Sequence, residues 1–138
     1  MSAVGSQKMR TMSKIGKLEE IKAWQEAREL VKEIYSVTSK GRFARDFGLR
    51  DQIRRASVSV MSNVAEGYAR SSDKEFARFL SIALGSTAEV QSQLYVALDL
   101  AYITNSEFDR LYNLSSKTAK LITGFMNYLK KPSTGGLS

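Results

Sequence analysis

The scarcity of proline restricts the fold of this chain more than any other feature. Its 138 residues include a single proline, Pro132, close to the C-terminal end. Proline ends or kinks a helix, and long stretches of the remaining sequence also lack clusters of turn residues. Apolar residues that recur at steps of three and four fill those stretches. The sequence therefore predicts an all-α protein.

The first two helices are predicted from their apolar stripes. One is expected over residues 18–38, and its predicted core face consists of Ile21, Trp24, Ala27, Val31, Ile34, Tyr35 and Thr38. A second is expected over residues 47–70, with the core face Leu49, Ile53, Ala56, Val60, Val64 and Gly67. The segment between them, SKGRFARDFG (residues 39–48), is expected to form a loop.

The last two helices are predicted from capping boxes, in which a Ser or Thr and a Glu three residues later each bond the other's backbone N–H group. Ser72 and Glu75 open a helix that extends to about residue 101, and Thr104 and Glu107 open one that ends at the proline. Loops of only a few residues between the last three helices favour antiparallel neighbours. We therefore expect a single-domain, up-down antiparallel four-helix bundle over residues 17–131.

The two ends of the chain lack a sustained apolar period. Residues 1–16 and 132–138 are expected to be a disordered N-terminal arm and a disordered tail. No apolar run approaches the roughly 20 residues that a membrane-spanning helix needs, and the N-terminus lacks the apolar segment of a signal peptide. These features predict a cytoplasmic protein with no membrane partner.

The residue types that most catalytic and metal sites need are missing. The chain has no His and no Cys, which removes the commonest general base and the thiolate nucleophile. Glu66 and Glu89 lie on largely apolar helices, but the di-iron sites of helical bundles pair such carboxylates with His. Ser57, Ser59 and Ser62 have no base or oxyanion-hole motif beside them. We expect no enzyme activity, no metal site and no cofactor.

The second and third helices each carry an apolar stripe opposite the core face. Such a stripe needs a second partner, which favours self-association, and closed symmetry would give a ring or a dimer rather than a fibre. Isolated surface apolar residues are the simpler alternative. The predicted interface and its polar network comprise Arg55, Val58, Ser59, Met61, Asn63, Glu66, Ile82, Gly85, Glu89 and Gln93. Ligand binding at Asn63 and Glu66 is a second alternative.

Positive charge is the chief indication of a partner. The formal net charge of +7 favours polyanions such as RNA, DNA or anionic lipid. The candidate nucleic-acid-binding residues are Arg42, Arg45, Arg50, Arg54, Arg70, Lys74 and Arg78. In an antiparallel hairpin the first four lie at the opposite end from the last three, and neighbouring acids could neutralise several of them. A solvated basic face is therefore the alternative.

Two arginines of the second helix are expected to differ in role. From their positions on the helix, Arg55 points toward Glu66 and is expected to pair within the polar network. Arg50, with Arg42 and Arg45 of the preceding loop, is expected to be available to phosphate.

The sequence resembles a known bacterial family. The segments WQEARELVKEIY, GLRDQIRRASVSVMSNVAEGYARSSDKEFARFLSIALGSTAEVQSQL and ALDLAYI are similar to proteins encoded in intervening sequences of large-subunit ribosomal RNA genes. That family is similar to the accessory variability determinant proteins of diversity-generating retroelements. The resemblance covers about residues 18–130. The family's characteristic positions match Gln52, Arg54, Arg55, Ser59, Asn63, Glu66, Gly67, Phe79, Gly85 and Glu89.

The resemblance implies a four-helix bundle that assembles into a ring-like homopentamer without catalytic residues. It also implies a basic surface for nucleic acid and, in the retroelement relatives, binding to a reverse transcriptase. The chain departs from the family at Met61, where proline is frequent, and in its arginine-rich first loop. We expect a homo-oligomeric accessory protein that binds RNA or an RNA–DNA hybrid. The alternative is an oligomeric adaptor that binds proteins and no nucleic acid.

Overall fold

The computed structural model describes residues 16–131, and all the regular elements in this range are helices. The predicted all-α class is confirmed, with a single domain. Most of the expected N-terminal arm (residues 1–15 of it) and the expected tail lie outside the described residues. The elements are the 3-10 helix η2 (Leu18–Glu20) and the α-helices α2 (Lys22–Thr38), α3 (Gly41–Arg45), α4 (Phe47–Tyr68), α5 (Asp73–Asp99) and α6 (Asn105–Lys130).

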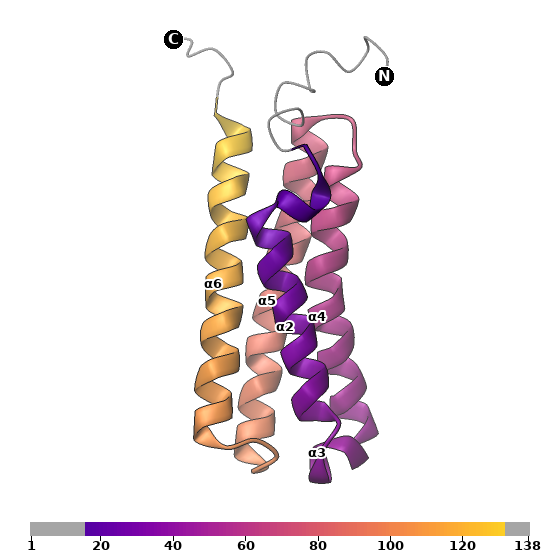
Figure 1. The fold of residues 1–138 in the computed structure, drawn as a ribbon, viewed down its shortest axis with the longest axis vertical. Coiled ribbons are helices and arrows are strands. Elements are labelled where there is room, and N and C mark those ends of the chain that lie inside the picture. Colours follow the sequence, from indigo (N-terminus) through magenta and orange to yellow (C-terminus); the bar gives the residue numbers. More distant parts are fainter. Residues whose placement is uncertain (1–15, 132–138) are drawn as a thin grey trace.

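The four long helices lie side by side (Figure 1). α2 packs against α4 and α6, and α5 packs against the same two helices. The short helix α3, the start of α4 and the connection from α5 to α6 lie together at one end, which we call the lower end. The connection from α4 to α5 lies at the other, upper end. The two groups of basic residues therefore lie at opposite ends of the molecule.

The first inter-helix segment is not the loop that the sequence predicts. Residues 41–45 form α3, and Phe43 at its centre is fully buried. The ring of Phe43 packs against Tyr102, with 5.3 Å between the ring centroids. Asp46 then caps α4, because its carboxylate accepts a hydrogen bond from the backbone N–H of Leu49 at 3.1 Å. Burial of one aromatic side chain thus orders a segment whose Gly, Ser and Arg content suggested a loop.

The core face of α4 agrees with its predicted stripe, whereas that of α2 is rotated. In α2 the buried residues are Ala23, Ala27, Leu30, Ile34, Val37 and Thr38. The predicted core residues Trp24 and Val31 are only half-buried, and Tyr35 is exposed. Two adjacent stripes with the same spacing exist in this helix, and the one with smaller side chains and without aromatic polar groups faces the core.

The two predicted capping boxes differ in the structure. Thr104 and Glu107 form a complete box, in which each side chain accepts from the other's backbone N–H. Ser72 accepts from the N–H of Glu75 at 3.2 Å, but the Glu75 carboxylate pairs with Arg78 instead of returning to Ser72. The second half of that predicted box is therefore wrong, because a nearby guanidinium competes for the carboxylate.

Candidate nucleic-acid interface

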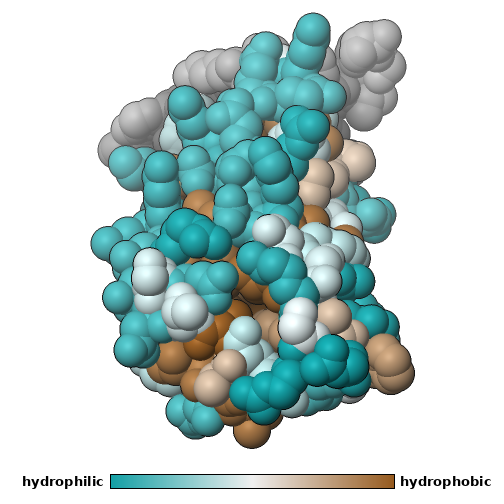
Figure 2. Space-filling view, turned by 60° about the horizontal axis from the view of Figure 1, so that its bottom comes forward, coloured by the Kyte–Doolittle hydropathy of each residue, from teal (hydrophilic) through white to brown (hydrophobic). Residues whose placement is uncertain are grey.

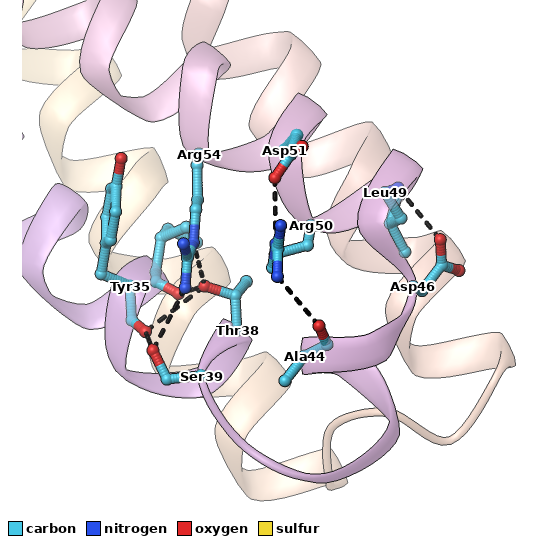
Figure 3. Close-up of polar contacts among 10 residues, drawn as sticks. Tyr35, Thr38, Ser39, Ala44, Asp46, Leu49, Arg50, Asp51 and Arg54 are labelled. Atoms are coloured by element: carbon cyan, nitrogen blue, oxygen red, sulfur yellow. Dashed lines mark hydrogen bonds and ion pairs between the residues drawn. The ribbon is translucent and has the colours of Figure 1, made fainter.

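Arg50 at the lower end is held by its own chain (Figure 3). Its Nε donates to Asp51 Oδ1 at 2.9 Å, and its Nη1 donates to the carbonyl oxygen of Ala44 at 3.0 Å. The guanidinium also lies 4.7 Å from the centroid of the Phe47 ring. Residues of α3 and α4 thus fix the position of a side chain that the sequence predicts to be available to phosphate.

Arg54 is one turn further along α4 and is held in a similar way. Its Nε donates to Thr38 Oγ1 at 2.8 Å and its Nη2 donates to Ser39 Oγ at 3.1 Å, so it fastens α4 to the end of α2. Its guanidinium lies 4.4 Å from the centroid of the Tyr35 ring. Figure 3 shows Arg50 and Arg54 extending from α4 toward the segment that joins α2 to α4.

Arg42 joins α3 to the end of α5. Its Nη2 donates to the carbonyl oxygen of Leu100 at 3.1 Å, and its guanidinium lies 5.4 Å from the Tyr102 ring centroid. The hydroxyl of Tyr102 in turn donates to Asp46 Oδ2 at 2.9 Å. This hydrogen bond raises the pKa of Tyr102 above its ordinary value of 10.0, with smaller contributions from burial and from the charge of Asp46, while Arg42 acts in the opposite direction.

Arg45 differs from the other three arginines that are predicted to bind nucleic acid at the lower end. It is exposed on α3 and makes no hydrogen bond or ion pair with residues 16–131. Lys40, nearby in the chain, makes only a long contact of 3.9 Å with Glu107. At this end, Arg45 is therefore the predicted phosphate-binding residue whose guanidinium is free to form a bidentate contact.

The basic residues at the upper end are also largely paired. Arg70 bonds the Glu66 carboxylate one turn earlier in α4, and Arg78 bonds Glu75 at 3.2 Å. Both guanidiniums lie beside the ring of Phe79, at 4.8 Å and 4.5 Å from its centroid. The exposed Lys74 makes no hydrogen bond or ion pair within the described part of the chain. A phosphate at this end would meet Lys74 without first displacing a carboxylate.

The predicted interface lies along an open groove of about 900 Å³ over the outer surfaces of α4 and α5. Part of the expected polar network is present: the Nδ2 of Asn63 donates to the Ser59 carbonyl oxygen at 2.9 Å, and the hydroxyls of Ser59 and Ser86 are 2.9 Å apart. Ser86 is a member of this network that is not predicted from the sequence, although its spacing from Glu89 and Gln93 on α5 was the available signal.

Several polar groups of the groove lack partners within residues 16–131, among them those of three residues predicted to lie in the interface. The carboxylate of Glu89 and the guanidinium of Arg55 make no hydrogen bond or ion pair there, although both line the groove. The Oε1 of Gln93 is buried and accepts no hydrogen bond. Glu66, toward which Arg55 is expected to point, bonds Arg70 instead. Within one subunit Arg50 is thus held by hydrogen bonds, whereas the Arg55 guanidinium makes none with the described residues.

Apolar residues of the predicted interface are partly exposed. Val58 on α4 and Ile82 on α5 are 37% and 42% exposed. A Cβ added to the exposed Gly85 would meet no atom within 4 Å, so the surface there is open. Met61 departs from the prediction, because it is half-buried against the core and lines a different groove, beside Trp24 of α2.

Neither a metal-binding cluster nor a membrane-spanning helix is found among the described residues. In residues 16–131 no group of three or more acidic side chains could hold a metal ion. Within that range no helix combines the length and the apolar character needed to cross a bilayer.

Comparison with known proteins identifies relatives. A family model described as "23S rRNA-intervening sequence protein" matches residues 19–124. A similar solved structure is that of a protein of unknown function from the S23 ribosomal protein family of Bacteroides thetaiotaomicron. It has a TM-score of 0.71 and 23% sequence identity, and the match covers 76% of this chain and 95% of that chain. At this identity the similarity supports the fold alone. Among curated proteins, none matches this chain.

Proposed function

The chain belongs to the 23S rRNA-intervening sequence protein family, and on this basis we propose that it is a non-enzymatic, homo-oligomeric protein that binds RNA or an RNA–DNA hybrid. The family's description ties it to genes for ribosomal RNA. A cytoplasmic location is part of the proposal, because RNA of ribosomal origin is available there.

The observation that carries the nucleic-acid part is the concentration of charge at the lower end. Residues 40–55 contain six basic and two acidic side chains, a net charge of +4 out of +7 for the whole chain. This segment includes all of α3 and the first turns of α4, which lie together in Figure 1. A local excess of positive charge attracts phosphates and gives binding that weakens as salt is added.

The assembly part rests on the groove over α4 and α5. Arg55, Glu89 and Gln93 present unpaired polar groups beside exposed apolar side chains, which is how a surface that another subunit covers is built. We infer that the four long helices form the up-down antiparallel bundle of the family and that copies assemble in a ring, nearest five subunits. The link to accessory variability determinant proteins, and to a reverse transcriptase as partner, rests on the resemblance of residues 52–67 and 75–86.

Fluorescence anisotropy with a labelled RNA at several salt concentrations tests the proposal. We expect binding at low salt whose affinity falls steeply as salt is raised. The double variant Arg45→Ala, Lys74→Ala removes the two predicted contacts that have no partner among residues 16–131, and it should weaken binding. The variant Lys117→Ala, which removes a positive charge paired with Glu26 on another surface, is the control. Absence of binding at low salt would refute the nucleic-acid part.

An oligomeric adaptor that binds proteins is the second candidate. The observation that favours it is that five of the seven predicted nucleic-acid-binding residues, Arg42, Arg50, Arg54, Arg70 and Arg78, already bond groups of their own chain. If the chain forms an oligomer and binds no RNA at low salt, this candidate is the better one.

A further inference from the structure

We propose that the lower end binds unpaired segments of RNA, by stacking bases on Phe47 and Tyr35. The inference rests on the proposed function and adds the class of RNA and the residues that select it. Two arginines that the sequence predicts to bind phosphate are held by groups of their own chain. Arg50 and Arg54 are fixed by hydrogen bonds, and each lies against an aromatic ring.

The two rings are accessible although each has an arginine beside it. Phe47 is 63% exposed and Tyr35 is 40% exposed. A large apolar ring gains little by lying in water, and the hydrogen bonds of Arg50 to Ala44 and Asp51 keep the guanidinium beside Phe47 in place. Each pair is thus an ordered platform with an aromatic ring and a planar cation. Bases stack on both kinds of group.

The surroundings of these platforms favour a polyanion. The platforms lie within or beside residues 40–55, which carry the net charge of +4. Arg45 lies between Tyr35 and Phe47 in the sequence, and its guanidinium bonds no group of the described residues. It can contact the phosphate that follows a stacked base. In Figure 2, where the lower end comes forward, hydrophobic residues lie in a hollow that hydrophilic residues border. An apolar surface bordered by hydrophilic side chains suits a base together with its phosphate.

Stacking on a side chain requires that the base is not already stacked in a helix. Bases inside a duplex present only their edges, whereas loops and single strands can turn their faces outward. Phosphate contacts alone would favour the duplex, because a duplex carries more negative charge per unit length than a single strand. The rings therefore predict a preference for single-stranded RNA that the charge does not explain.

The test compares three fluorescent probes of equal length: oligouridylate, the same strand annealed to oligoadenylate, and an abasic strand with the same phosphates. We expect the full-length protein to bind oligouridylate most tightly. The variant Phe47→Leu keeps an apolar side chain and removes the ring. It should weaken oligouridylate binding by about fivefold or more, the smaller end of what one stacked base contributes, and leave the abasic strand unchanged.

Two further variants separate stacking from charge. Arg45→Ala should weaken all three probes and lower the salt slope for a single strand by about 0.7. Tyr95→Ala is the matched control, because Tyr95 is exposed but packs with Phe108 and Tyr112 rather than with an arginine. Light scattering of every variant shows that the oligomer is unchanged.

The outcomes distinguish this inference from the function on which it rests. Equal affinity for the strand and the abasic probe, or parental affinity of Phe47→Leu for oligouridylate, would overturn the stacking site while leaving RNA binding intact. The exposed rings would then be better explained as contacts for a protein partner. No binding of any probe at low salt would refute the proposed function itself.

Discussion

Ala101 adopts a backbone conformation that L-residues with a side chain rarely adopt. Its φ is +58°, at the position just after α5 where glycine is usual. The N–H of Tyr102 bonds the carbonyl oxygen of Ala97, and the N–H of Ala101 bonds that of Leu98, both at 2.9 Å, so the C-terminal Schellman motif is complete. The motif therefore forms despite an unfavourable side chain.

Replacing this residue should stabilise the chain. We expect Ala101→Gly to raise the free energy of unfolding by about 0.5–1 kcal/mol, because glycine adopts positive φ without the steric cost that alanine has. Urea unfolding measures it. Ala69→Gly is the control, since Ala69 ends α4 with a φ of −78° and gains nothing from glycine. A loss of stability in Ala101→Gly would contradict the steric argument.

Tyr102 gives the lower end a dependence on alkaline pH. Because its pKa is raised in the folded chain, the folded state holds the phenol proton more tightly than the unfolded state does. The stability from its hydrogen bond to Asp46 is therefore complete below pH 10.0, the ordinary value, and is lost as pH rises through the folded-state pKa.

The variant Tyr102→Phe lacks this hydrogen bond and should be less stable than the parent at neutral pH. The difference between the two free energies of unfolding should shrink above pH 10.0. Denaturant titrations over the alkaline range measure both. A difference that stays constant with pH would show that the phenol proton contributes nothing.

The contacts of Arg50 and Arg55 show what the sequence predicts about a single side chain. Helical spacing predicts the side of α4 from which each side chain extends. It does not indicate where a long side chain ends, because its partners come from other elements. Arg50 reaches the Ala44 carbonyl oxygen, which is in place only because α3 forms. The guanidinium of Arg55 bonds no group of residues 16–131, and Glu66 bonds Arg70 instead.

At the scale of whole elements, α4 and α5 approach each other closely at Gly67. A Cβ at this position would lie 2.7 Å from Phe76 Cδ1, 3.0 Å from Phe79 Cβ and 3.1 Å from the Phe76 carbonyl oxygen. One of these atoms belongs to the backbone and cannot move aside without shifting α5. The start of α5 is therefore fixed against the end of α4 by the absence of a side chain.

We expect Gly67→Ala to destabilise the chain. Overpacking costs about 1–3 kcal/mol, which exceeds the gain of about 1 kcal/mol from replacing glycine by alanine in a helix. Thermal unfolding measures the net effect. Gly85→Ala is the matched variant, because no atom lies within 4 Å of its added Cβ. It should be stabilising within one subunit, and a loss of stability similar to that of Gly67→Ala would refute the packing argument.

Whether the sequence predicts an element depends on whether a local pattern or tertiary packing determines it. α4, α5 and α6 are long, and each has one dominant stripe or a strong N-cap, so periodicity locates them and their core faces. α2 offers two adjacent stripes, and only packing against α4 and α6 decides between them. α3 has five residues, too few for a period, and forms because Phe43 is buried against other elements. Tertiary contacts, which no local pattern encodes, decide both cases.

At the scale of the molecule, its long sides and its two ends offer different kinds of contact. The ends carry the basic residues, whereas the groove over α4 and α5 carries apolar side chains with unpaired polar groups. Copies joined through the groove would leave the ends uncovered. Arg45 and Phe47 do not line the groove and would stay accessible, whereas Tyr35 and Arg54 line it, so their platform would be shared between assembly and nucleic-acid binding. Repetition of the lower end around a ring would multiply weak contacts with one RNA.

Assembly can be tested at Ile82 of α5, which is not one of the residues proposed to bind RNA. Ile82 is 42% exposed on the groove side of α5, so Ile82→Glu introduces a charge at little cost to an isolated subunit. In an assembled interface the same carboxylate would be buried without a partner, which is strongly unfavourable. Light scattering should therefore show a lower mass than the parent, while thermal unfolding of the helices changes little.

Two matched variants identify the face and not merely the added charge. Tyr128→Glu changes a residue that is 44% exposed on α6, away from the groove, and should keep the parental mass. Met61→Lys should act differently again, because Met61 packs against the core beside Trp24: it should lower the stability of the subunit itself. If Ile82→Glu and Tyr128→Glu have the same mass as the parent, and that mass is of several subunits, the ring uses another face. If the parent is a monomer at every concentration, the assembly part of the proposed function is refuted.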